Sequence, residues 1–344
     1  MSANAETDWT PPLPAATETE DGEPRRIGVE LEMIEVDVDT VSGILAGQLG
    51  GEIEKTSRYE HVVHGDDAGD WRVELDYAYL KERGRERDGA GDDDGPGDEI
   101  GELVADVAES MLRAGAEAVV PVEIVSPPLP LPRLADVQAL VPVLRDAGAK
   151  GSGAGLSYAF GMQLNPELPG LDARTVAAYL KAFFCLYDWL SARASVDLTR
   201  RLTGFSAAFP GSYVRRVVDP DYWPDLEALI DDYLEDNPTR NRALDMLPLF
   251  LHLDRERVRA VVDDPRVKAR PTLHYRLPNC EIHRDDWGIH LAWGDWLQVE
   301  ALAADRDRLA ELCGAYSDWL DKPLGRLLDS WPDECERRLG LANP

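Results

Sequence analysis

Two glutamates in the segment RRIGVELEMIEVDVD (25–39) lie among apolar residues. The segment alternates as a β-strand does over 26–38, which places Glu30 and Glu32 on one strand face. Two carboxylates roughly 7 Å apart on such a face repel each other, and each loses hydration if it is buried. A divalent cation or a cluster of arginines would relieve both costs. From Glu35 onward the acids fall on the other face and fit ordinary contact with solvent.

Two further segments repeat this combination of acids and strand periodicity. VVPVEIVSPPL (119–129) places Glu123 in a β-branched run, and DWRVELDYAYL (70–80) places Glu74 and Asp76 on one face. Carboxylates from several strands are the hard oxygen ligands that Mg²⁺ or Mn²⁺ prefers. For any single acid a salt bridge to arginine is an equally good explanation, but the repetition across strands favours a metal site.

Basic residues in three segments could supply the positive half of such a site. The segments are YVRRV (213–217), NPTRNRALDMLP (237–248) and RPTLHYR (270–276). Arg240 and Arg242 lie within one turn. Arg270, His274 and Arg276 are all even-numbered and would share a strand face. The planar guanidinium suits phosphate and carboxylate, although these arginines could also only balance the charge of an acidic protein.

The elements that must position these side chains follow from hydrophobic periodicity. Strands are expected at 26–38, 70–80, 119–129, 156–165 and 270–278. Helices are expected at 40–49, 102–118, 133–147, 223–235, 239–252, 254–263 and from 291 to 339, and a long helix follows its N-cap Asp172. Strands that are separated by helices, and spaced too far apart for a meander, predict an α+β fold with one sheet covered by helices.

Composition excludes several classes of partner. The 344 residues carry 65 acidic against 36 basic side chains and a net charge of −29, which argues against duplex nucleic acid and anionic membrane. No leader pattern and no stretch of about eighteen apolar residues is found, and the four cysteines show no CxxC pair, so we expect a cytoplasmic protein with reduced thiols. We expect a disordered lead over 1–24, one catalytic domain over 25–340, and a flexible acidic insertion at 81–99.

RRIGVELEM, WRVELDYAYL and VEIVSPPLP, in this order and spacing, resemble the amidoligase family, relatives of glutamine synthetase and γ-glutamylcysteine ligase. The resemblance covers roughly residues 25–300. It implies the glutamine-synthetase-like catalytic fold, in which a mainly antiparallel sheet curves around the active site and is covered by helices. It also implies ATP-dependent formation of an amide or peptide-like bond through an acyl phosphate, with Mg²⁺ or Mn²⁺ as the metal.

The resemblance assigns the metal ligands by position. Glu30, Glu32 and Glu123 match the metal-binding acids of the relatives. Asp76 falls where the family has W…D-G-S, but the Gly-Ser half is missing here, so Glu74 is the alternative to Asp76.

Two other positions depart from the family pattern. The relatives have G-x-H-x-N or G-x-H-x-H where this chain has GMQLN, which gives Gln163 and Asn165. They have E-x-R where this chain has HYR, which gives His274 and Arg276. Either a second metal site has been rebuilt with His274, or that site has been lost.

The remaining roles follow from the same resemblance. Arg276 and Arg270 are expected to stabilise the transferring phosphoryl group, and Arg240 and Arg242 to bind nucleotide or the substrate carboxylate. Arg276 and the Gln163, Asn165 and His274 positions would contact the nucleotide or its metal. The substrates would be a small-molecule or peptide carboxylate and an amine, and a homo-oligomer is possible. Two alternatives stay open: a catalytically lapsed member that binds a peptide or nucleotide as a partner protein, and a metal-dependent hydrolase that uses the same acids.

Overall fold

A computed structural model describes most of the chain. The described residues are 9–76, 120–152, 161–194, 208–322 and 330–341. Several sequence predictions lie outside them, among these the helix at 102–118, the insertion at 81–99, the end of the strand at 70–80, and the first half of the strand at 156–165.

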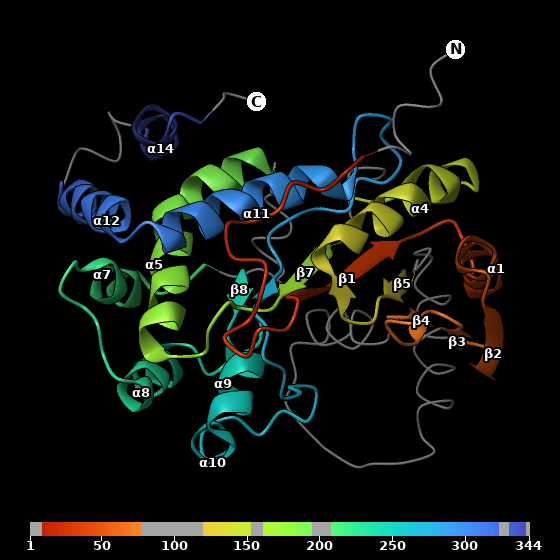
Figure 1. Ribbon diagram of the computed structural model, residues 1–344, viewed down its shortest axis with the longest axis horizontal. Helices are drawn as coiled ribbons and strands as arrows, with labels where there is room; N and C mark the ends of the chain where they lie inside the picture. The colour runs from red at the N-terminus through yellow and green to blue at the C-terminus, as the bar shows by residue number, and fades with distance from the viewer. Residues whose placement is uncertain (1–8, 77–119, 153–160, 195–207, 323–329, 342–344) are drawn as a thin grey trace, which may run out of the picture.

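The described strands form one sheet in which all neighbouring pairs are antiparallel (Figure 1). The order is β2-β3-β4-β5-β1-β7-β9-β8, and β6 pairs with β1 off this path. The strands are β1 (Arg26–Met33), β2 (Glu52–Ser57), β3 (Glu60–His64), β4 (Trp71–Leu75), β5 (Val122–Val125), β6 (Leu129–Pro130), β7 (Met162–Pro166), β8 (Leu244–Asp245) and β9 (His274–Tyr275). β1 therefore lies in the middle of the sheet, with β5 and β7 on either side.

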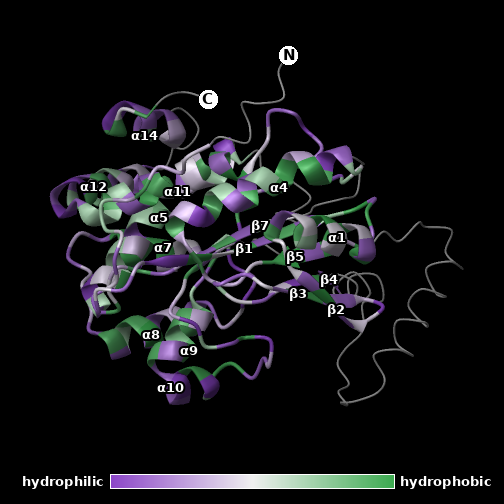
Figure 2. Ribbon diagram, turned by 45° about the vertical axis from the view of Figure 1, so that its right-hand side comes forward, coloured by the Kyte–Doolittle hydropathy of each residue, from purple (hydrophilic) through white to green (hydrophobic). Residues whose placement is uncertain are grey.

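Helices cover the sheet, which confirms the expected mixture of an antiparallel sheet and covering helices. They are α1 (Val38–Leu49), α4 (Leu134–Asp146), α5 (Ala173–Arg193), α7 (Gly211–Val218), α8 (Leu226–Asp236), α9 (Leu247–Leu253), α10 (Arg255–Arg259), α11 (Ile289–Ala304), α12 (Arg306–Asp321) and α14 (Trp331–Leu339). Figure 1 shows α1, α4 and α11 above the sheet and α9 with α10 below it. The alternating colours of α1 and α4 in Figure 2 show that these helices are amphipathic. In the described part of the chain, no helix is both long and apolar enough to cross a membrane.

The two faces of β1 differ as its alternation predicts. Ile27, Val29, Leu31 and Met33 are buried in the hydrophobic core. Glu30 and Glu32 lie on the opposite face and are only partly buried. The acidic face points away from this core, and Glu30 lines a cavity there.

The end of β1 differs from the sequence prediction, because the strand stops at Met33 rather than continuing to residue 38. Glu35 has a φ of 62°, a left-handed conformation that interrupts the strand. Asp37 then caps α1 by accepting a hydrogen bond from the Thr40 backbone N–H at 2.6 Å. The acids after Glu32 thus belong to a turn and a helix start, although Glu35 and Asp37 face solvent as expected.

The second half of the chain also differs from its prediction at three places. Residues 239–252 form β8 and α9 instead of one helix, since Pro248 lies in the first turn of α9, where a missing N–H costs no hydrogen bond. The strand expected at 270–278 is reduced to β9, and the helix expected at 254–263 to α10. Helix α7 contains a basic segment for which no element was expected. The N-cap of α5 is Asp172, as predicted.

Residues 9–24 were expected to belong to a disordered lead, but they lie against the body of the molecule. The Trp293 indole N–H donates to the Pro12 carbonyl at 2.8 Å. The Arg25 guanidinium, which is buried beside α11, donates to the Ala16 carbonyl at 2.7 Å. Trp9 also packs against the core. The polar composition of this segment concealed these few contacts, which hold it across α11 (Figure 1).

Candidate active site

Carboxylates on three neighbouring strands face one another across the sheet. The register pairs Glu32 of β1 with Glu123 of β5, and Glu123 in turn with Glu74 of β4. Glu30 lies two residues before Glu32 and is opposite Gln163 of β7. Because side chains of paired residues point to the same face of a sheet, these acids gather on one face, opposite the core face of β1.

Burial and mutual repulsion make this acidic face unfavourable without a positive partner. Burial raises the pKa of the Glu123 carboxyl well above its ordinary value, and the negative charges of Glu30, Asp76, Glu32 and Glu74 raise it further. The pKa of Glu74 is also raised, chiefly by burial. A bound proton or a cation would relieve this cost.

The donor set on this face consists of carboxylates, which suits a hard divalent cation such as Mg²⁺. Within the described residues, however, no group of three or more acid, His or Cys side chains is already arranged as a metal site. Glu32 instead accepts a hydrogen bond from the Gly161 backbone N–H at 2.7 Å. The acids fit a divalent cation by their chemistry, and their side chains would have to turn toward it.

Two amides hold Glu30 in place. Gln163 Nε2 donates to Glu30 Oε1 at 3.0 Å, and Asn165 Nδ2 donates to the same oxygen at 2.9 Å. Gln163 Nε2 also donates to Asn165 Oδ1 at 2.7 Å. Both residues come from β7, the strand next to β1, and both are buried. These contacts orient one oxygen of Glu30 and leave its other oxygen available to a ligand.

The two positions that depart from the relatives' pattern lie side by side. His274 Nδ1 is 3.0 Å from Gln163 Nε2, although the two residues are 111 positions apart in the chain. Burial lowers the pKa of His274 well below its ordinary value, and the charges of Arg276, Arg270 and Arg240 lower it further. The imidazole is therefore neutral near pH 7, which is the form that can bind a metal. Its Nε2 has no hydrogen-bond partner among the described residues.

Arginines occupy the opposite side of the same cavity, which has a volume of about 230 Å³. Arg240, Arg270 and Arg276 line it together with Glu30, Glu74, Glu123 and Gln163. In the described part of the chain, the guanidinium groups of Arg240 and Arg270 have no ion-pair or hydrogen-bond partner. Burial and the charge of Arg276 lower the pKa of Arg240. Such cations, partly buried and not neutralised by an acid, are suited to bind an anion.

Four predicted site residues are not among those that line this cavity, and one of them is Asn165, which holds Glu30 as described above. Arg242 donates to the carbonyls of Ala208 at 2.7 Å and Asp236 at 3.2 Å, and its guanidinium lies over the Phe209 ring. Asp76 is close enough to Glu123 to raise the pKa of that carboxyl. Glu32 is held by Gly161, as described above. The other eight predicted site residues line the cavity.

Asp245 and Arg72 line the cavity and were not predicted from the sequence. Asp245 lies on β8 beside His274 of β9, with Arg276 Nη2 at 3.4 Å from its carboxylate. Burial raises the pKa of Asp245 to about 6. The sequence held a usable signal, because Asp245 is the one acid in the apolar run ALDML, as Glu123 is in its own strand.

Comparison with known protein families identifies the family of this chain. A family model described as "Putative amidoligase enzyme" matches residues 23–298, well over half of the chain. The matched range contains every residue named in the cavity. Neither the curated proteins nor the solved structures gave a match. The chain therefore belongs to the amidoligase family.

Proposed function

We propose that this protein is an ATP-dependent carboxylate–amine ligase that uses a divalent cation. One observation carries the proposal beyond the family assignment: acids of β1, β4 and β5 line a single cavity together with Arg240, Arg270 and Arg276. A metal–nucleotide complex needs both kinds of side chain, because acids hold the cation while arginines bind phosphate oxygens.

The proposed reaction has two steps. A substrate carboxylate oxygen attacks the γ-phosphorus of ATP, the bond from that phosphorus to ADP breaks, and an acyl phosphate forms. The nitrogen of an amine then attacks the acyl carbon, the carbon–oxygen bond to phosphate breaks, and the amine loses a proton. The products are an amide, ADP and phosphate.

Each side chain of the cavity has a proposed task in these steps. Glu30, Glu32 and Glu123 would hold Mg²⁺, with Glu74 or Asp76 as a further ligand. The cation, when bound, would neutralise phosphate oxygens. Gln163 and Asn165 keep Glu30 oriented through the hydrogen bonds described above.

The arginines have a separate task, which is to stabilise charge on the phosphoryl group as it transfers. Arg270 and Arg276 line the cavity close to His274, and Arg240 lies on the same side. Such fixed positive charges supply most of the catalysis of phosphoryl transfer. We extend the proposal to the fold, in which the antiparallel sheet corresponds to the curved sheet of glutamine-synthetase-like enzymes.

Calorimetry with ATP and Mg²⁺ tests whether the site is used. The wild-type protein should bind ATP in a Mg²⁺-dependent manner, and Glu30→Gln with Glu32→Gln should weaken that binding by at least about tenfold, since two ligand charges are lost. Glu52→Gln, an exposed acid on β2, is the matched control. Absence of nucleotide binding in the wild-type protein would leave the lapsed, ligand-binding family member as the better description.

A further inference from the structure

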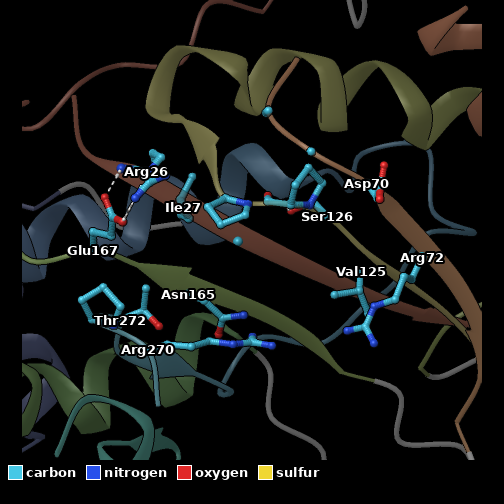
Figure 3. A pocket seen from close by; sticks show the side chains of 16 residues that line it. Arg26, Ile27, Asp70, Arg72, Val125, Ser126, Asn165, Glu167, Arg270 and Thr272 are labelled. Atoms are coloured by element: carbon cyan, nitrogen blue, oxygen red, sulfur yellow. Dashed lines mark hydrogen bonds and ion pairs between the residues drawn. The ribbon is translucent and has the colours of Figure 1, made fainter. Parts of the chain in front are cut away.

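A second cavity, of about 440 Å³, adjoins the first on the same face of the sheet. Arg72, Val125 and Arg270 line both cavities, so these residues stand at the border between them. Figure 3 shows the second cavity, with Arg72 and Arg270 reaching into it and the Arg26–Glu167 pair at its other end. Neither Arg72 nor this cavity has a role in the function proposed above.

The charged groups at the far end of the second cavity already neutralise each other. Glu167 accepts from the Arg26 backbone N–H at 2.8 Å and from the Arg26 guanidinium at 3.0 Å. Asp70 contacts His64 at 2.8 Å. These four groups therefore leave no strong net charge for a ligand to balance.

The two arginines at the border are different. Arg72 forms an ion pair with Glu74, and its closest nitrogen–oxygen distance of 3.9 Å is longer than a hydrogen bond. The Arg270 guanidinium has no ion-pair or hydrogen-bond partner in the described part of the chain. At the border, Arg72 thus has only a long ion pair and Arg270 has no acid partner in the described part of the chain, so a bound anion could pair with both guanidinium groups.

The rest of the second cavity has a mixed lining. Its apolar part comes from Ile27, Ala68, Val125, Pro127, Pro128 and Pro271, and its uncharged polar side chains are Ser126, Asn165 and Thr272. Gly28 also lines this cavity and adds no side chain to it. No aromatic side chain is among the described residues that line this cavity, so it lacks a stacking partner for a nucleobase. Its volume lies in the range that holds small organic molecules.

We propose that this second cavity binds the carboxylate substrate, a small aliphatic acid whose carboxylate lies between Arg72 and Arg270 and whose body lies against Ile27, Ala68 and the prolines. The inference rests on the proposed ligase function and names its substrate class. The carboxylate would sit at the border of the two cavities, where the first cavity delivers the γ-phosphoryl group. Binding in this position brings the two reacting groups together.

Titration with simple acids tests this inference. Butyrate and glutarate serve as probes and butyramide as the uncharged match of butyrate, each followed by ligand-observed NMR with and without Mg²⁺ and a non-hydrolysable ATP analogue. The wild-type protein should bind the two acids and bind butyramide at least about tenfold more weakly, since the amide cannot pair with the arginines.

Substitutions locate the binding. Arg72→Gln and Arg270→Gln should each weaken binding of the acids about tenfold, and Arg270→Lys should retain part of it because the charge remains. Arg58→Gln, which removes the same charge from an exposed position, should change nothing. Equal binding of butyramide, unchanged binding in both glutamine variants, or no binding of either acid in both nucleotide states would overturn the inference.

A further variant separates this inference from the proposed function. Ala68 lines the second cavity and not the first, so Ala68→Leu should fill the aliphatic space. It should abolish binding of the acids and leave ATP binding within about twofold of wild type. If wild-type protein binds ATP but no acid, only the substrate cavity is wrong. If it binds no ATP, the proposed ligase function fails as well.

Discussion

At the scale of single residues, the cavity shows how a protein keeps acids on a partly buried face. Glu30 is stabilised by two amide donors, whereas burial and the charges of four neighbouring acids raise the pKa of Glu123 well above the ordinary value. A carboxylate in this position reduces the stability of the folded state unless it gains a proton or a cation. Glu123 is therefore retained at a cost to stability, which is typical of residues that bind or catalyse.

Replacement of Glu123 should separate stability from ligand binding. Without divalent cations, Glu123→Gln should raise the melting temperature by roughly 2–4 °C, about 1 kcal/mol, because it removes a repelled charge and keeps the shape of the side chain. Addition of Mg²⁺ should raise the melting temperature of the wild-type protein and not that of the variant. Thermal unfolding in EDTA and in Mg²⁺ measures both effects. A variant that melts below the wild-type protein in EDTA would show that Glu123 is paired.

The sequence predicted which acids gather on the sheet face, because a charge inside an apolar strand is visible in the order of residues. It did not predict that Gln163 and Asn165 would hold Glu30, since such a contact depends on the register of β1 against β7. Asp245 and Arg72 were missed for the same reason. The positions of Asp245 and Arg72 at the cavity depend on which strands pair with one another. Two of these strands, β8 and β9, are only two residues long.

At the scale of elements, one carboxylate joins the β3–β4 turn to the start of α4. Asp66 accepts from both terminal nitrogens of Arg133, at 2.5 and 2.9 Å, from the Trp71 indole N–H at 2.8 Å and from the Ala68 backbone N–H at 2.9 Å. Its side chain is 2% exposed. The Arg133 guanidinium lowers the pKa of Asp66, and the N–H donors of Ala68 and Trp71 lower it further, to about 2.

This contact makes a pH-dependent contribution to stability. Because the folded-state pKa is below the ordinary value of 3.8, the stabilisation is complete above about pH 4 and is lost as the pH falls toward 2. Asp66→Asn should cost about 2 kcal/mol at pH 7, and the difference from wild type should shrink between pH 4 and 2. Urea unfolding at several pH values measures it. Asp136→Asn, which removes a more exposed partner of Arg133, is the control and should cost less than about 1 kcal/mol.

If Asp66→Asn cost the same at pH 2.5 as at pH 7, its effect would come from packing and not from charge.

The elements themselves were predicted well where one face is apolar over many residues, as in α4 and α5. They were predicted poorly where a single backbone conformation decides the outcome. The left-handed Glu35 that ends β1 and the proline that starts α9 are examples, since periodicity does not report either one.

At the scale of the whole molecule, the start and the end of the matched region meet in one buried network. Arg25 forms an ion pair with Glu300 of α11 at 2.7 Å, and their side chains are 0% and 3% exposed. Glu300 also accepts from the Trp296 indole N–H at 3.0 Å and from the Tyr179 hydroxyl. The network joins β1, α5 and α11, and the segment 9–24 lies across the same region. This buried network lies on the side of the sheet opposite the cavity.

Neighbouring arginines allow a matched test of this network. Arg25→Met should cost about 3–5 kcal/mol of unfolding free energy, because it leaves the Glu300 carboxylate buried and unpaired. Arg26→Met removes a partner of Glu167 from a side chain that is 53% exposed, and it should cost about 1 kcal/mol or less. Adding Glu300→Leu to Arg25→Met should recover part of the loss. Similar costs for Arg25→Met and Arg26→Met would show that burial does not make the Arg25–Glu300 pair contribute more to stability.

The overall layout could be inferred from the sequence in part. The order of strands and helices and the resemblance in three short motifs indicated a sheet covered by helices and a family that the comparison confirmed. The packing of residues 9–24 could not be inferred, because it depends on a few contacts with α11, a helix almost 300 residues further along the chain.

Release of ADP from ATP is the measurement that tests the central claim most directly. Purified protein with ATP and Mg²⁺ is screened against pairs of one carboxylate and one amine, drawn from amino acids, polyamines and small peptides, with each compound also tested alone. The account predicts that at least one pair stimulates ADP release well beyond either compound alone, and that the Glu30→Gln, Glu32→Gln variant loses the stimulation. ADP release that is independent of the amine would contradict it and would indicate a metal-dependent hydrolase.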